Sequence, residues 1–537
     1  MSGEAGELGG QAQPPPTSST RVARSTLIVM GGLLAALLTG LIRQRIIAVQ
    51  FGTSAPMDAF IAANGLPELL FIMLAGGALG FAFIPIYTEF LTSEDHSGAD
   101  RLASQVVNSI FILALIVSAL AALLAPTIVT APWGLAPHFP EPVQALTVEL
   151  IRLLLLSTII FAISSIVSSV LQSHQHFILP ALSPTVYNFG LIFGALVLAP
   201  TMGIHGLAWG AIVGALLHLG VQIPGLFRFR VHWFPTLGWR NPALHRVAIL
   251  MAPRVIDLMM ARASIDWLNA NIASGLGEGR LSSLRYAFQL MNMPWTLIGT
   301  AIGIAVFPTL ATLAAKHDTN AQRNALSGSL RAILTLTLPA AVGLLLLGRP
   351  IIRVLFEGGE FTSESTNLVF FALQFYVLAL ISQSVLEVVV RAFASRRDTV
   401  TPLLISFFTT ALNIGLAIWL SRPERLSTGG LALANGVAVG VEALIGLTII
   451  QRRWGIVRVR QVLLDLGRAA ASTLAMALVI WIALALLPSG PIVQLIIAGG
   501  LGTLTYVLVA YALGIEEIIS LPRALLQGIA RPRAAQA

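Results

Sequence analysis

The chain has 537 residues, of which 56% are hydrophobic and only 10% are charged. Soluble domains are about one quarter charged, so this composition excludes a soluble globular protein and predicts one embedded in a membrane. The formal net charge of +8 does not indicate a nucleic-acid partner, because the arginines gather in loops that flank apolar segments. The absence of cysteine excludes disulfides, thiolate metal sites and cysteine nucleophiles.

A polar stretch opens the chain. Residues 1–24 are rich in Gly, Pro and Ser and hold no apolar run, which predicts a disordered cytoplasmic tail and not a signal peptide. Apolar segments of about 20 residues then recur to the end of the chain, and their length predicts about fourteen membrane-spanning helices. The predicted spans centre near residues 37, 72, 114, 158, 189, 216, 259, 297, 337, 378, 410, 440, 474 and 502.

Basic residues fall mainly on one side of these spans. Arg21 and Arg24 precede the first span, residues 228–246 hold four arginines before the seventh, and residues 452–460 hold four before the thirteenth. The excess of positive charge on cytoplasmic loops, together with an even number of spans, predicts a multi-pass protein with both termini in the cytoplasm.

The sequence repeats itself faintly at a period of about 222 residues. AFIPIYTEFL around Pro85 returns as AVFPTLATLA around Pro308, and NFG at Asn188 returns as NIG at Asn413. Six spans separate the members of each pair, which favours two parallel repeats over chance likeness between apolar segments. We therefore predict an all-α integral membrane fold, with two pseudo-symmetric six-helix lobes around a central cavity and two C-terminal helices.

The predicted boundaries follow from this repeat. An N-lobe of six spans occupies residues 25–228, a cytoplasmic linker residues 229–244, and a C-lobe of six spans residues 245–453. The last two spans lie within residues 454–515, and residues 516–537 form a cytoplasmic tail.

The second predicted span contains a carboxylate and several helix-weakening residues. In GLPELLFIMLAGGALGFAFIPIYTEF, residues 65–90, Glu68 lies inside an apolar run. A helix broken by proline and rich in glycine can bend, so we predict a gate or hinge element with Glu68 facing water. The alternative is a glycine packing face with Glu68 near the lipid interface. The hinge residues are Pro67, Gly76, Gly77 and Gly80.

The seventh predicted span, MAPRVIDLMMARASIDWLNANIAS, is the most polar. An ionised group at mid-bilayer costs about 3 kcal/mol, so retained charges usually face a wet cavity or a partner. We predict that this span lines a substrate-binding cavity; the alternative is ion pairs that neutralise one another or side chains that snorkel to the headgroups. The candidate cavity residues are Arg43, Asp58, Glu68, Arg254, Asp257, Arg262, Asp266, Arg285 and Gln289.

Enzyme motifs are missing. The chain has no GxxxxGK[ST] phosphate loop, no HExxH or comparable metal spacing and no GxSxG elbow. His174 and His176 fall in a short loop, where solvation is a better interpretation than metal binding. The sequence predicts a transporter with no cofactor, no metal and no catalytic residues.

Several blocks of sequence resemble one family in order. AVQFGTSAPMDAFIAANGLPELL is similar to its FG…DAF…A…PNLL segment, and GALGFAFIPIYTEF to its GA…AFVP…EY continuation. The blocks MAPRVID…ASGL…LSSLRYAFQLMNMPWTLIGTAIGIAVFPTLA and VLFEGGEFTSEST…VVRAFASRRDTVTPLLI also look like family segments. Over essentially the whole chain after residue 24, the sequence resembles the MurJ/MviN family of lipid II flippases, within the multidrug/oligosaccharidyl-lipid/polysaccharide exporter superfamily.

The resemblance implies a fourteen-helix flippase of the bacterial inner membrane that works by alternating access. It implies lipid II, the undecaprenyl-pyrophosphate-linked precursor of peptidoglycan, as the substrate, and the peptidoglycan synthesis machinery as a partner. A cavity with arginines can hold the diphosphate while the prenyl tail stays in lipid. The driving force stays open between a coupling ion, H⁺ or Na⁺, and the membrane potential.

The chain differs from the family at the positions where the resemblance implies charged residues that hold the substrate's phosphates. Arg43 and Asp58 match family positions, but family charges are absent at Leu37, Gln44, Phe71, Ile72, Gly76 and Gln289. Arg254, Arg262 and Arg285 could restore the positive charge from other positions. The alternatives are a same-fold exporter of another prenyl-linked saccharide or amphiphile, and an inactive scaffold paralogue.

Overall fold

The computed structural model describes the backbone of residues 18–75, 78–262, 266–487 and 490–518. Side chains are described over the same ranges except at residues 18–29, 75, 78, 79, 81, 252–254, 256–258 and 260–262. The described residues form helices joined by short loops, without a named strand among them. The predicted hinge glycines Gly76 and Gly77 lie outside these ranges, as do the side chains of Arg254, Asp257 and Arg262.

The first half of the chain contributes ten helices before residue 230, in the ranges described. They are α1 (Ser18–Phe51), α2 (Ala55–Ala75), α3 (Ala78–Thr92), α4 (His96–Thr130), α5 (Glu141–Ser173), α6 (Ile178–Phe193), the π-helix η1 (Gly194–Leu198), α7 (Ala199–Met202), α8 (Ile204–Gly220) and α9 (Ile223–Arg228).

The second half begins after an extended linker. Its helices are α10 (Pro242–Arg262), α11 (Leu268–Ala273), α12 (Arg280–Pro294), the π-helix η3 (Trp295–Thr300), α13 (Ala301–Ala315), α14 (Thr319–Phe356), α15 (Ser363–Ser395), α16 (Val400–Leu420), α17 (Ser427–Trp454), α18 (Val459–Leu486) and α19 (Pro491–Ala512).

Thirteen helical segments within the described ranges are long and apolar enough to cross a membrane. The remaining predicted span, the polar seventh, corresponds to α10 and α11. The part of α10 whose side chains are described throughout contains a shorter apolar helix, Pro242–Met251. The predicted fold class, an all-helical multi-pass membrane protein, is confirmed.

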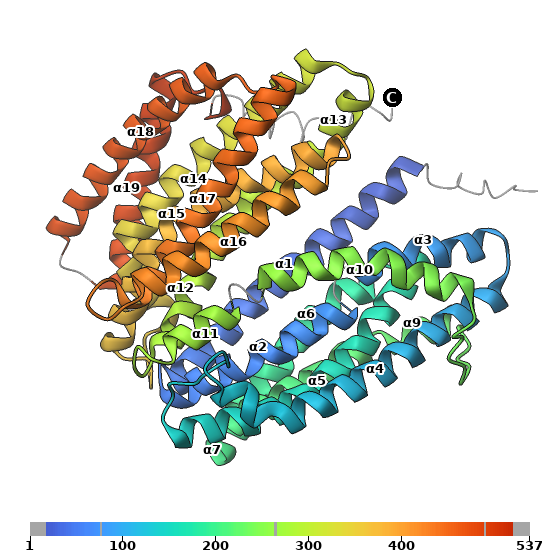
Figure 1. Cartoon of the computed structure of the whole chain (residues 1–537). Coiled ribbons are helices and arrows are strands. Elements are labelled where there is room, and N and C mark those ends of the chain that lie inside the picture. The colour runs from blue at the N-terminus through green and yellow to red at the C-terminus, as the bar shows by residue number, and fades with distance from the viewer. Residues whose placement is uncertain (1–17, 76–77, 263–265, 488–489, 519–537) are drawn as a thin grey trace, which may run out of the picture.

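The helices gather into two halves. Figure 1 shows α1 to α9 on one side and α13 to α19 on the other, with the ribbons converging near α2, α11 and α12 and diverging toward α3 and α13. The end where they diverge carries the arginine-rich loops 229–241, 396–399 and 455–458, and we call it the basic end. Although α10 was predicted as the first span of the second lobe, it packs against α2, α3 and α4 of the first.

Glycine packing joins helices inside the first half. A Cβ atom on Gly190 of α6 would lie 2.2 Å from the Cα atom of Gly214 in α8, and one on Gly194 would lie 2.6 Å from the Cα atom of Gly210. The two backbones are therefore in direct contact. Because lipid tails are as apolar as the helices, such close packing supplies most of the attraction between them.

The linker between the halves is bound along one face of α4. Asn108 donates from Nδ2 to the carbonyl oxygens of Phe234 (2.8 Å) and Thr236 (2.9 Å), and Ser104 accepts from the Phe234 amide at 3.0 Å. The linker makes few backbone hydrogen bonds within itself, such as the one from the Thr236 amide to the Phe234 carbonyl, so the side chains of α4 supply further partners and hold it in place.

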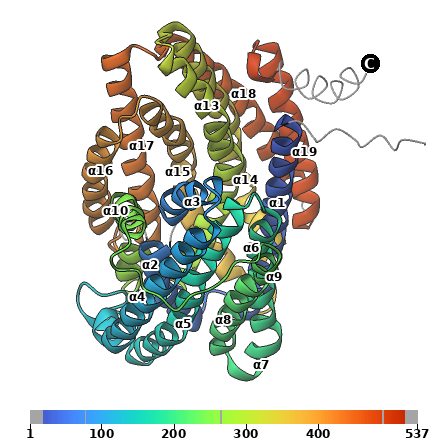
Figure 2. The same cartoon turned by 90° about the vertical axis from the view of Figure 1, so that its right-hand side faces the viewer.

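Charged groups anchor the last two helices. Arg331 of α14 contacts Asp465 of α18 at 2.5 Å and Glu516, after α19, at 3.0 Å. Figure 2 shows α18 and α19 beside α14 at the edge of the second half. Truncating Arg331 would leave the buried Asp465 with Arg468 as its remaining partner and would remove the link from α14 to the segment after α19.

The glycine contact can be tested with Gly190→Ala. The new methyl group would collide with the α8 backbone, which cannot turn aside, so we expect a loss of about 1–3 kcal/mol and a lower Tm in detergent. Gly220→Ala on α8 is the matched control, because a Cβ atom there has no neighbour within 4 Å. Equal Tm values for the two variants would contradict this packing.

Candidate functional site

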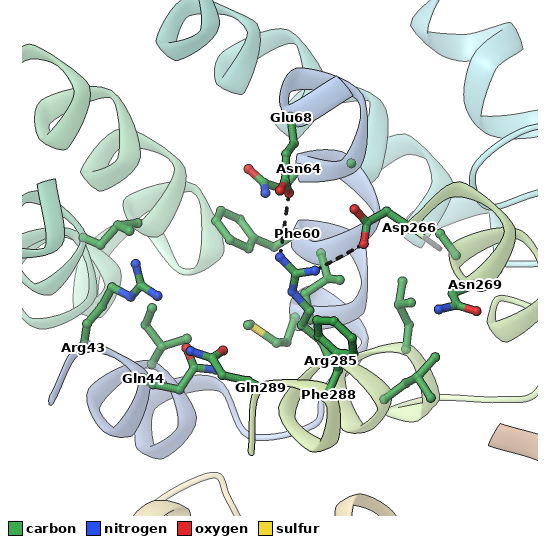
Figure 3. Close-up of a pocket in the computed structure, with 18 of the residues that line it drawn as sticks. Arg43, Gln44, Phe60, Asn64, Glu68, Asp266, Asn269, Arg285, Phe288 and Gln289 are labelled. Atoms are coloured by element: carbon green, nitrogen blue, oxygen red, sulfur yellow. Dashed lines mark hydrogen bonds and ion pairs between the residues drawn. The ribbon is translucent and has the colours of Figure 1, made fainter. Parts of the chain in front are cut away.

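A cavity of about 210 Å³ lies between the two halves. Residues of α1, α2 and α6 form one wall, and residues of α11, α12 and α15 form the other (Figure 3). Apolar side chains such as Phe60 and Phe288 alternate with polar ones around it. Its polar lining consists of Arg43, Gln44, Asn64, Glu68, Tyr187, Asp266, Asn269, Arg285, Gln289 and Tyr376.

Arg285 of α12 is the centre of the charged contacts in this cavity. Its Nη1 atom lies 3.3 Å from Oδ1 of Asp266, and its Nη2 atom lies 3.7 Å from Oε2 of Glu68. Figure 3 shows the guanidinium between the two carboxylates. Because Glu68 belongs to α2 and Asp266 precedes α11, one arginine bridges both halves of the protein.

Arg43 of α1 lies elsewhere on the cavity wall (Figure 3). Its Nη1 atom donates to Oδ1 of Asn188 at 2.8 Å, and the amide of Asn188 is held by the carbonyl of Ala36 and the hydroxyl of Thr39. The buried Nε atom of Arg43 has no hydrogen-bond partner among the described residues. Arg43 thus brings a cation with unused donor capacity to the cavity, as an anionic ligand would require.

Asp58 lies outside this cavity, at the contact between the halves. Its carboxylate accepts hydrogen bonds from the backbone amides of Gly279 and Ser282, both at 2.7 Å. Glu278 reciprocates, since its Oε1 atom accepts from the amide of Ala55 at 2.9 Å. Each half therefore caps the first turn of a helix in the other half, α12 and α2 respectively, satisfying amides that have no partner within their own helix.

Further contacts close the same end of the cavity. Arg45 donates to the carbonyl of Val354 at 2.6 Å, and the hydroxyls of Thr53 and Ser365 lie 2.8 Å apart. Asn271 donates to the carbonyl of Gly134 at 2.6 Å. We call this the closed end. Between described residues, the hydrogen bonds and ion pairs that join α1–α9 to α11–α19 lie here or at the cavity, and none lies at the basic end.

The sequence located some of these residues and missed others. Of the predicted cavity residues, Arg43, Glu68, Asp266, Arg285 and Gln289 line one cavity together. Asn64, Tyr187 and Tyr376 were missed, because an isolated amide or phenol in an apolar helix has no spacing pattern. Asn269 lies in the seventh predicted span, which was expected to line the cavity. Glu278 was missed as well, because it caps α2 in the other half and no local pattern before α12 indicates that contact.

The predicted hinge residues remain predictions. Pro67 lies buried inside α2, directly before Glu68, and Gly80 lies in the first turn of α3. The predicted span at residues 65–90 is thus described as two helices on either side of Gly76 and Gly77.

Histidine and carboxylate groups offer little for metal binding. Within the described ranges, no group of three or more His, Cys, Asp or Glu side chains is placed to hold a metal ion. His174 stacks on Phe229 with ring centroids 4.6 Å apart, and burial lowers the pKa of the His174 imidazole. This loop histidine is packed, whereas the sequence predicted a solvated one.

Comparisons with known proteins point in one direction. The family model of the lipid II flippase MurJ matches residues 47–498. The lipid II flippase MurJ of Burkholderia cenocepacia is 30% identical over 433 residues, which cover 79% of this chain and 82% of that protein. The probable lipid II flippase MurJ of Rhizobium meliloti is 31% identical over 445 residues, 80% of each chain.

Solved structures share the fold. A lipid II flippase MurJ in an inward closed conformation superposes with a TM-score of 0.77 at 23% identity, covering 93% of this chain and all of that one. An inward-facing multidrug resistance transporter of the MATE family, in the MOP superfamily, gives a TM-score of 0.65 at 16% identity, covering 78% and 94% of the two chains.

The closed end can be tested with Asp58→Ala. The chain lacks cysteine, so Met57→Cys would place a single thiol in the cavity lining beside the contact. Losing two hydrogen bonds to a charged group costs about 1.5–3 kcal/mol each, so we expect labelling by a membrane-impermeant maleimide from the closed side to rise about tenfold or more.

The matched control is Asp318→Ala. Asp318 also caps a helix, through the Ala321 amide at 2.9 Å, but both residues lie in the same half. We expect labelling as slow as in the parent protein. If Asp58→Ala gave no more labelling than this control, the capping contact would not hold the end closed.

Proposed function

This chain belongs to the MurJ lipid II flippase family, and on that premise we propose that it moves lipid II from the inner to the outer leaflet of the bacterial inner membrane. The observation that carries the proposal is an arginine-bearing cavity between two helical halves that is closed at one end. A diphosphate and sugars cannot cross hydrocarbon unaided, whereas such a cavity gives them polar partners.

We propose that Arg43 and Arg285 hold the diphosphate. Arg43 has donor capacity to spare, and its guanidinium suits phosphate oxygens. Arg285 is engaged by Glu68 and Asp266, so the headgroup would have to replace at least one carboxylate. Since Glu68 comes from the other half of the protein, this exchange would loosen a link between the halves as the substrate binds.

Transport would follow by alternating access. In this proposal, lobes at residues 25–228 and 245–453 rock against each other, with the two C-terminal helices carried by the second. The arginine-rich loops favour a cytoplasmic location for the basic end and for both termini. The closed end then faces outward, and the state described is ready to receive substrate from the inner leaflet.

Opening the outer side would require release of the caps at Asp58 and Glu278. The freed backbone amides would become accessible to water, which can replace the lost hydrogen bonds. This limits the cost of opening, as a transporter that cycles between two states requires.

Partners follow from the substrate. A membrane-associated synthetic step must supply the lipid at the cytoplasmic face, and a polymerising step must consume it outside, so the peptidoglycan synthesis machinery is the expected partner. We propose that a proton, a sodium ion or the membrane potential sets the direction of transport. Asp58, Glu68, Asp257, Asp266, Glu387 and Glu442 are the acidic candidates within spans for coupling to an ion.

A different prenyl-linked saccharide is the second candidate. It is favoured by the neutral residues Leu37, Gln44 and Gln289, where the family resemblance led us to expect charge. Gln44 and Gln289 both line the cavity, so their amides could select sugar hydroxyls in place of charged groups.

Binding measurements can decide between these candidates. Protein in nanodiscs would be titrated at matched salt with lipid II, with a prenyl pyrophosphate carrying an unrelated sugar, and with an anionic phospholipid. We expect selective binding of lipid II. Arg43→Gln and Arg285→Gln should each weaken it about tenfold to a hundredfold, the loss of a charged hydrogen bond.

Arg425→Gln is the matched control, because Arg425 stacks on Trp419 in a loop away from the cavity, 4.0 Å from the ring centroid. Preference for the unrelated sugar would favour the second candidate. Equal binding of all three lipids would refute both.

A further inference from the structure

A second cavity lies within the first half. It has a volume of about 380 Å³ and is lined by residues of α2, α5, α6 and α8. Asn64, Glu68 and Tyr187 line it as well as the cavity between the halves. Glu68 therefore stands in the wall between the two spaces. We call the second space the N-half chamber; its other polar lining residues are Ser157, Thr158, Ser165 and His218.

His218 is held in this chamber by a chain of hydrogen bonds. Its Nδ1 atom lies 2.7 Å from the hydroxyl of Ser164, and that hydroxyl accepts from Nε2 of Gln222 at 2.9 Å. Ser168 in turn donates to Oε1 of Gln222 at 2.7 Å. Ser164 and Gln222 are fully buried. From Ser164 to Ser168 and from His218 to Gln222, each helix advances one turn toward the basic end, so the chain leads from the chamber in that direction.

The titratable groups of the chamber are few. Besides Glu68, only Tyr187 and His218 among its lining residues can change charge. The residues of α5 that line the chamber are serine, threonine and phenylalanine, so α5 contributes no further titratable side chain to the lining.

Glu68 also faces charges from other elements. At the cavity between the halves, Arg285 of α12 contacts it, and Asp266 and Arg43 line the same space. In addition, α10 packs against α2 and carries Arg254, Asp257 and Arg262 in its sequence. Among the described lining groups of this cavity, two arginines balance two carboxylates.

We propose that the N-half chamber is a proton-binding site coupled to the substrate cavity, in which Glu68 takes up a proton through His218 when a diphosphate displaces it from Arg285. The inference rests on the proposed function. A proton from water at the basic end binds the imidazole and passes to the carboxylate, which leaves a neutral imidazole and a neutral carboxylic acid.

Electrostatics supplies the reason. An arriving diphosphate brings negative charge beside Glu68 and removes Arg285 from its contacts, and like charges at such distances favour the neutral form of a carboxyl group. Once Glu68 is protonated, Asp266 is the single charged carboxylate among the described lining residues that faces Arg43 and Arg285. Substrate binding and proton uptake then strengthen each other, as linkage requires.

Calorimetry can test whether Glu68 is the group that accepts the proton. Lipid II binding to the full chain in nanodiscs would be measured at one pH in two buffers with different ionisation enthalpies, which gives the protons taken up. We expect an uptake of up to about one proton per lipid bound in the parent protein and close to zero per lipid bound in Glu68→Gln. Glu149→Gln, which alters an exposed carboxylate paired with His205, should keep the parent uptake.

The outcomes separate the two proposals. If the parent protein does not bind lipid II, the proposed function fails. If it binds lipid II without proton uptake, or if Glu68→Gln takes up as many protons as the parent, only the present inference is overturned.

A pH jump tests the route. With lipid II already bound, a pH-sensitive dye would follow proton exchange by the protein after rapid mixing. We expect His218→Gln to slow this exchange about tenfold or more, while the number of protons at equilibrium stays the same. His205→Gln on the same helix should leave the rate unchanged. An unchanged rate in His218→Gln would remove His218 from the route.

Discussion

A charged side chain inside a membrane must find an opposite charge or water, and the arrangement of this protein depends on how Arg285 meets that requirement. Its guanidinium lies between Asp266 in its own half and Glu68 in the other. The pair with Glu68 holds the halves together at the cavity, yet it occupies the group best suited to bind an anion. The ion pair that stabilises the empty state and the binding of a diphosphate therefore both require the same arginine.

The closed end uses a different kind of contact. Helix termini carry backbone amides without partners in their own helix, and here the first turns of α2 and α12 are capped by Glu278 and Asp58 across the interface. Capping contacts can exchange with water, so this end can be tight without being permanent.

Movement between the halves requires that each half stay intact. The direct backbone contact at Gly190 and Gly214 fixes α6 on α8, and Arg331 fixes the last two helices on α14. The linker is bound along α4, which carries α10 with the first half. The first half, as packed in this structure, therefore includes both the linker and α10.

The sequence alone was sufficient for the fold class, because an apolar segment of about 20 residues in hydrocarbon has to be a helix. It also singled out Arg43, Glu68, Asp266 and Arg285, since charges in such segments are rare enough to stand out. The family followed from blocks in order, and these survive even where the expected clamp charges are replaced.

Only the tertiary structure decided how these charges are used. Among the described side chains, Asp266 contacts Arg285, which lies 19 residues away in the chain, and spacing along one helix does not predict such a pair. Asp58 turned out to close an end and not to line the cavity, because its partners are backbone amides, which every sequence contains. His218 could not be distinguished from any other histidine in an apolar helix until α5 and α8 placed Ser164 beside it. Spacing along one helix reports neighbours on that helix, whereas a cavity is built from several.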